Sequence, residues 1–99
     1  MGRDAVIDEN IRGWFLNDNR GQLQGYEKTF TAGVNGDLPW LDSDDKIATF
    51  CKENNCDLFT SDKKSYTNYF DAKIKTIQIT RHAYWRDGKR PIFLIRIID

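Results

Sequence analysis

The most constraining feature of the sequence is an amphipathic helix signal that begins near residue 43, between two segments typical of strands. Ser43 can cap the first turn, and Asp44 and Asp45 favour the positive end of the helix dipole. The pair Asn54-Asn55 can adopt the left-handed backbone conformation that ends a helix. A helix flanked by strands favours an α/β fold. The apolar residues of this helix recur on one face at helical spacing: Ile47, Ala48, Phe50 and Cys51.

Apolar or β-prone runs on both sides of this helix predict five strands. We place them at residues 4–8 (DAVID), 24–34, 56–60 (CDLFT), 74–80 and 91–98 (PIFLIRII). Two further short helices are expected over residues 9–16 and 63–70, and Asp87-Gly88 signals a hairpin turn. The order β-α-β-α-β-α-β-β implies a three-layer α/β sandwich with a mostly parallel central sheet.

Length and composition indicate one domain over residues 1–99. The chain is 39% hydrophobic and 30% charged, too apolar for a disordered tail and too polar for a membrane protein. No export signal is visible, so we expect a cytoplasmic protein with no membrane partner. We expect Cys51 and Cys56 to be buried or half-buried free thiols, because two cysteines and one histidine do not supply the four ligands of a zinc site.

Three aspartates stand where predicted strands end or helices begin. Asp8 closes the first strand, Asp44 opens the central helix, and Asp62 follows the strand over 56–60. If those two strands are neighbours, Asp8 and Asp62 project to one edge of the sheet, where Asp44 could join them. Carboxylates gathered in this way repel one another unless a cation lies between them, and hard oxygen ligands suit Mg²⁺ or Mn²⁺. The alternative is that these acids only cap helices and turns.

Residues 5–10 (AVIDEN) resemble the opening of short PIN-like proteins, in which a strand runs into an Asp-Glu-Asn motif. Residues 43–47 (SDDKI) and 55–62 (NCDLFTSD) are similar to the two acidic segments that follow in that family. The resemblance spans roughly residues 4–80 and implies a PIN-like fold. Within that fold, Asp8, Asp44 and Asp62 would be the catalytic acids and would hold one or two divalent metal ions.

The function that this resemblance implies is a metal-dependent ribonuclease that uses Mg²⁺ or Mn²⁺ to hydrolyse single-stranded RNA. Several relatives are toxins neutralised by an antitoxin protein, which makes an antitoxin a candidate partner. Asn10 would be a supporting polar group, and Glu9 either an outer acid of the site or a solvated residue of the first helical turn.

The chain departs from the family pattern after Asp62. Where the family often continues Asp-x-Asp-Phe, this chain has Lys64 in place of the last acid and no phenylalanine after it. Asp71 is the other acid that could serve there. The departure leaves a second hypothesis, a catalytically impaired PIN-like module that binds RNA or a protein. A structural α/β interaction protein is the third, and PIFLIRII at a sheet edge would then offer a homodimer surface.

Charge is distributed unevenly, although the whole chain is neutral. Residues 1–62 hold six basic and twelve acidic residues, and residues 63–99 hold nine basic and three acidic residues. Cations interleaved with aromatic rings suit single-stranded nucleic acid, whereas Tyr66 and Phe70 are better explained as core residues. No motif places a serine or cysteine nucleophile beside His82, so the sequence does not support a catalytic triad. The candidate nucleic-acid-binding residues are Lys63, Lys64, Arg81, Trp85 and Arg86.

Overall fold

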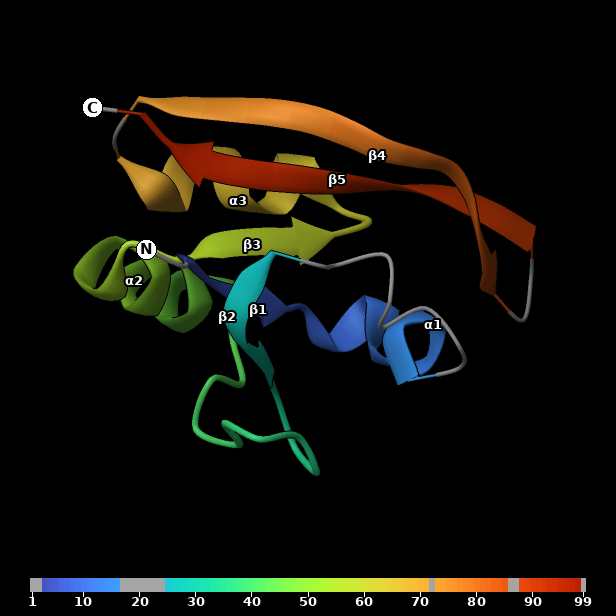
Figure 1. Cartoon of the computed structure of the whole chain (residues 1–99), viewed down its shortest axis with the longest axis horizontal. Helices are drawn as coiled ribbons and strands as arrows, with labels where there is room; N and C mark the ends of the chain where they lie inside the picture. Colours follow the sequence, from blue (N-terminus) through green and yellow to red (C-terminus); the bar gives the residue numbers. More distant parts are fainter. Residues whose placement is uncertain (1–2, 17–24, 72, 86–87, 99) are drawn as a thin grey trace.

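A computed structural model describes residues 3–16, 25–71, 73–85 and 88–98 (Figure 1). The elements follow the order of the chain as β1 (Arg3–Ile7), η1 (Glu9–Ile11), α1 (Arg12–Leu16), β2 (Tyr26–Thr31), α2 (Asp44–Asn54), β3 (Asp57–Thr60), α3 (Lys63–Phe70), β4 (Ile74–Trp85) and β5 (Gly88–Ile97). Each predicted strand and helix has a counterpart, and the α/β class is confirmed. None of the described helices is long and apolar enough to cross a membrane.

The five strands form one sheet in the order β2-β1-β3-β5-β4. Strand β1 is parallel to both of its neighbours, whereas β5 is antiparallel to β3 and to β4. The expectation of a mostly parallel sheet is therefore wrong, because two of the four pairings are antiparallel. The physical reason is the close succession of β4 and β5. A short connection can join antiparallel strands, but parallel strands need a long crossover.

Side chains alternate across the sheet and build a separate apolar cluster on each face. Helices α2 and α3 cover one face, where Ile47 and Phe70 pack against β1 and β3. The other face is covered by the short η1–α1 segment, through Ile11 and Phe15. The third layer of the predicted sandwich is thus only a few residues long in the described part of the chain.

Helix α2 begins and ends close to where the sequence predicts. Asn55 adopts the left-handed conformation at its end, with φ of 53°. Ser43 occupies the N-cap position but makes no side-chain cap, because its hydroxyl donates to the Asp45 carboxylate instead. Cys51 and Cys56 are buried free thiols, as expected. Burial, with the charges of Asp4 and Asp57, raises the pKa of Cys56 to about 11, so this thiol is protonated at neutral pH.

The β4–β5 hairpin extends past the rest of the sheet (Figure 1). Strand β3 pairs only with residues 93–95 of β5, whereas the β4–β5 ladder continues to Trp85 and Gly88. PIFLIRII therefore lies between β3 and β4, not at an edge of the sheet. The edge strands are β2 and β4, so the expectation that PIFLIRII lies at a sheet edge is wrong.

Candidate functional site

The ends of β1 and β3 lie side by side, because these strands are parallel neighbours with Ile7 opposite Phe59. The backbone N–H of Asp8 donates to the Phe59 carbonyl over 2.9 Å. Beyond this point the chain leaves β1 toward η1–α1 on one face and leaves β3 toward α3 on the other. Such a divergence is the topological switch point at which α/β sheets bind ligands.

Asp8 is the buried acid at this switch point, with 6% of its surface exposed. Two hydroxyls donate to its Oδ2, Thr60 Oγ1 over 2.7 Å and Tyr66 Oη over 2.8 Å. Burial raises the pKa of Asp8, and the negative charge of Asp44 raises it further. The two hydroxyls lower the pKa but do not cancel the increase. The surroundings of Asp8 therefore stabilise its ionised form less than water does.

Asp44, the first residue of α2, lies close enough to act on the same groups. Burial raises the pKa of Tyr66 far above its ordinary value, and the carboxylates of Asp8 and Asp44 both add to that increase. The Tyr66 hydroxyl therefore remains protonated and can donate at neutral pH. The Tyr66 hydroxyl thus donates to Asp8, and the charge of Asp44 acts on both groups.

Asp62 follows the end of β3 that lies next to Asp8, but its carboxylate contacts helix α3. It is exposed, occupies the N-cap position of α3 and accepts a hydrogen bond from Ser65 Oγ over 2.6 Å. Its backbone N–H donates to Thr60 Oγ1 over 3.0 Å, so Thr60 connects Asp62 with Asp8. Among the described residues, no three Asp, Glu, His or Cys side chains form a group that could hold a metal ion.

Two buried oxygens next to these strand ends have no hydrogen-bond partner among the described residues. They are Oδ1 of Asn10, two residues after Asp8, and Oγ of Ser61, between Thr60 and Asp62. Unpaired buried polar atoms are uncommon and often occur where water, an ion or a ligand binds. Glu9 is exposed, and its side chain lies against Gly33.

The predicted nucleic-acid-binding residues are only partly described. Lys63 and Lys64 are exposed in the first turn of α3, and Lys63 Nζ lies 4.5 Å from the centre of the Phe93 ring. The backbones of Arg81 and Trp85 belong to β4, but their side chains lie outside what the structure describes, as does all of Arg86. Tyr66 and Phe70 are buried, as expected of core residues.

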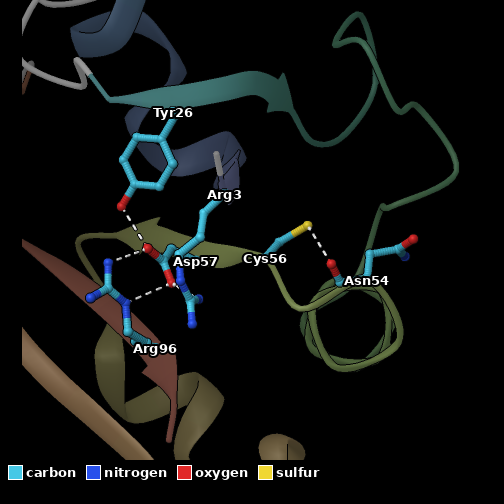
Figure 2. A network of polar contacts seen from close by, with 6 residues as sticks. All are labelled: Arg3, Tyr26, Asn54, Cys56, Asp57 and Arg96. Atoms are coloured by element: carbon cyan, nitrogen blue, oxygen red, sulfur yellow. Dashed lines mark hydrogen bonds and ion pairs between the residues drawn. The ribbon is translucent and has the colours of Figure 1, made fainter. Parts of the chain in front are cut away.

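A second polar network, which the sequence analysis missed, lies at the opposite end of β3 (Figure 2). Asp57 is fully buried and accepts hydrogen bonds from Arg3 Nη1 over 2.9 Å and Tyr26 Oη over 2.7 Å. Arg96 donates to both carboxylate oxygens, from Nε over 3.0 Å and from Nη2 over 2.7 Å. Burial alone would raise the pKa of Asp57, but these donors and the two positive charges hold it below the ordinary value. This network joins β1, β2, β3 and β5.

The sequence analysis also missed the hydroxyls that hold Asp8. Alternation along β3 puts Thr60 on the same face as Leu58, which was a usable signal. No local pattern reveals that the core residue Tyr66 turns its hydroxyl to a carboxylate 58 residues away. Comparisons with protein-family models, with curated proteins and with solved structures found no match to this chain, so the likeness to PIN-like proteins rests on its sequence motifs.

Proposed function

We propose that this protein is a divalent-cation-dependent ribonuclease of PIN-like type, with Asp8 and Asp44 as its central carboxylates. The observation that supports this function is a buried acid at the switch point, where burial and the charge of Asp44 raise the pKa of Asp8. A purely structural acid is expected to resemble Asp57, whose donors hold its pKa below the ordinary value. A buried carboxylate with a raised pKa beside a second acid suits a cation.

The residues present fit Mg²⁺ or Mn²⁺. Mg²⁺ is commonly bound through one or two carboxylates, with waters and substrate phosphates completing its oxygen ligands. Asp8 and Asp44 would supply the carboxylates, and the unpartnered Asn10 Oδ1 is a buried oxygen two residues after Asp8. Asp62, exposed one strand away, would act through water if it contributes. A bound divalent ion would lower the pKa of a water molecule and neutralise charge on a phosphodiester.

Substrate binding would involve the start of α3. Lys63 and Lys64 are exposed there, within a few residues of Thr60, which contacts Asp8. Lysines in this position would attract the phosphates of a single strand, and this part of binding would weaken as salt increases. An RNA strand that approaches along α3 would then meet the cation at Asp8. The toxin role and the antitoxin partner remain part of this proposal.

The test is cleavage of a fluorescent single-stranded RNA with Mn²⁺ or Mg²⁺ by the wild type, Asp8→Asn and Asp44→Asn. Losing a ligand should reduce cleavage by more than the roughly 10–100-fold cost of removing an outer partner of a metal site. Asp42→Asn is the matched control, because Asp42 is exposed, lies next to α2 and pairs only with Lys46 among the described residues. Wild-type cleavage by Asp8→Asn, or no cleavage by the wild type in excess metal, would contradict the proposal.

A second candidate function is supported by the region after β3. The Asp62 carboxylate accepts from Ser65, and Lys64 stands where the family pattern has an acid. These features favour a module that binds RNA or protein without cleaving it. RNA retention that is independent of metal, with no cleavage by the wild type, would favour this function over the nuclease.

A further inference from the structure

The exposed face of α2 borders a groove of about 290 Å³ that takes no part in the proposed nuclease site. One wall is helix α2, because the lining residues Asp45, Thr49 and Glu53 are spaced four apart and lie on one side of it. Lys46 and Phe50, also four apart, lie next to them. The other wall is Trp40 with Leu41, from the segment before α2. Trp40 is 58% exposed, whereas Leu41 is buried. The groove is therefore lined by both a buried leucine and an exposed tryptophan.

Negative charge stands at both ends of this groove. Asp45 lies in the first turn of α2 and Glu53 in its last, and both are exposed. Eight helical residues separate them, which corresponds to about 12 Å along the helix axis. The Lys46 ammonium forms its ion pair with Asp42, over 2.8 Å, and its charge is the smallest of the effects that lower the pKa of Asp45. A hydrogen bond from Ser43 lowers the pKa of Asp45, which remains a carboxylate at neutral pH.

The chemistry of the lining selects among ligands. Carboxylates at both ends repel nucleic acid and anionic lipid, so neither class suits this surface. A cationic side chain, in contrast, can meet a carboxylate and lie over the face of a tryptophan. Phe50 is held in place edge-to-face by Phe30, with ring centres 6.2 Å apart, and offers a rigid apolar contact midway along the groove.

We infer that this groove is a docking site for a basic segment of a partner protein. Two cationic side chains of the segment meet Asp45 and Glu53, and an apolar side chain between them packs against Trp40 and Phe50. An extended segment rises about 3.3 Å per residue, so cations four residues apart match the distance between the two acids. Exposed tryptophans are frequent centres of binding energy at protein interfaces, which accords with this arrangement.

The experiment uses a blocked heptapeptide, Gly-Arg-Ala-Leu-Ala-Arg-Gly, titrated into the whole protein and followed through the indole N–H signal of Trp40 by NMR. Trp40→Phe assigns that signal. We expect saturable binding that weakens with rising salt. The same peptide with both arginines replaced by glutamine should bind at least about tenfold more weakly. Equal binding of the neutral peptide would overturn the inference.

Variants test the two halves of the site separately. Asp45→Asn combined with Glu53→Gln, followed through the Trp40 indole signal, should weaken binding of the arginine peptide about tenfold. Trp40→Ala, followed through the backbone amide signals of α2, should weaken it by a similar factor. The matched controls are Glu27→Gln, an exposed acid on β2, and Tyr69→Ala, an exposed aromatic on α3. Both controls should bind as the wild type does. Unchanged binding by the groove variants would overturn the assignment.

Two further outcomes would also overturn it. A single-stranded uridine oligonucleotide that shifts the Trp40 signal would show that the groove takes nucleic acid. Concentration-dependent sedimentation that Trp40→Ala abolishes would show that it joins two copies of this chain. Nuclease activity is a separate readout, because Asp44 and Asp45 are consecutive and point about 100° apart around the helix. Asp45→Asn should therefore leave RNA cleavage unchanged whether or not the peptide binds.

Discussion

Replacing the buried Asp57 with asparagine tests whether its network is structural. The Asp57 carboxylate is fully buried, and three side chains donate to it from three other strands. Asparagine has nearly the same shape but keeps only one acceptor oxygen, and its new NH₂ group faces donors. The variant Asp57→Asn therefore leaves Arg3 and Arg96 without an opposite charge while the packing hardly changes.

The expected loss of stability follows from the exposure of the partners. Removing one partner of a fully buried ion pair costs about 3–5 kcal/mol. Here Arg3 and Arg96 each keep 36% of their side-chain surface exposed, so water can solvate part of the released charge. We therefore expect Asp57→Asn to lower the free energy of unfolding by about 2–3 kcal/mol. For a domain of this size, that corresponds to a melting temperature about 10–20 °C lower.

Urea unfolding followed by circular dichroism measures this difference, provided that the slope with denaturant is unchanged. Asp42→Asn, which breaks an exposed pair with Lys46, should remain close to the wild type. Because the folded-state pKa of Asp57 is lowered, its stabilisation is present above the unfolded pKa of about 4 and is lost as pH falls through the folded value. A difference close to zero at neutral pH, or one that grows on acidification, would refute the reasoning.

Two further predictions concern the other end of the sheet. Because the folded-state pKa of Asp8 is raised, its ionisation destabilises the protein as pH rises through that value, so Asp8→Asn should gain about 1 kcal/mol near neutral pH. Denaturation without metal should show this gain, and Mn²⁺ should stabilise only the wild type. Gly33→Ala should lose about 1–3 kcal/mol, since φ is +94° and a Cβ would lie 2.3 Å from Glu9 Oε2. Thermal melting should show a gain in stability for Gly13→Ala, because Gly13 lies in helix α1 and a Cβ there would meet no atom within 4 Å.

Those features of the fold that depend on local pattern could be predicted from the sequence. Helix α2 has acids at its start, a repeated apolar face and an asparagine that adopts the left-handed conformation at its end, all within about three turns. The strands over DAVID and CDLFT are short buried runs, and both form where expected. Position along the chain also placed Asp8 at a strand end and Asp44 at a helix start.

The missed features depend on contacts between distant parts of the chain. The Asp87-Gly88 signal predicts the antiparallel pair β4–β5, but it does not predict that β5 also pairs in antiparallel fashion with the more distant β3. The donors to Asp57 come from residues 3, 26 and 96, which no local spacing connects. Similarly, Thr60 and Tyr66 belong to a strand and a helix that meet Asp8 only in the folded chain.

The two buried aspartates of this sheet differ in how the surrounding residues act on their ionised forms. Asp57 and Asp8 lie at opposite ends of the adjacent strands β1 and β3, and both have little or no exposed surface. Asp57 meets two positive charges and a hydroxyl, so its ionised form is stabilised by the fold. Asp8 meets two neutral hydroxyls, a backbone group of Glu9 and another acid, so the fold stabilises its ionised form less than water does, and a cation beside it would favour that form. The effect of removing each charge, with and without a divalent cation, therefore tests the proposed site independently of any substrate.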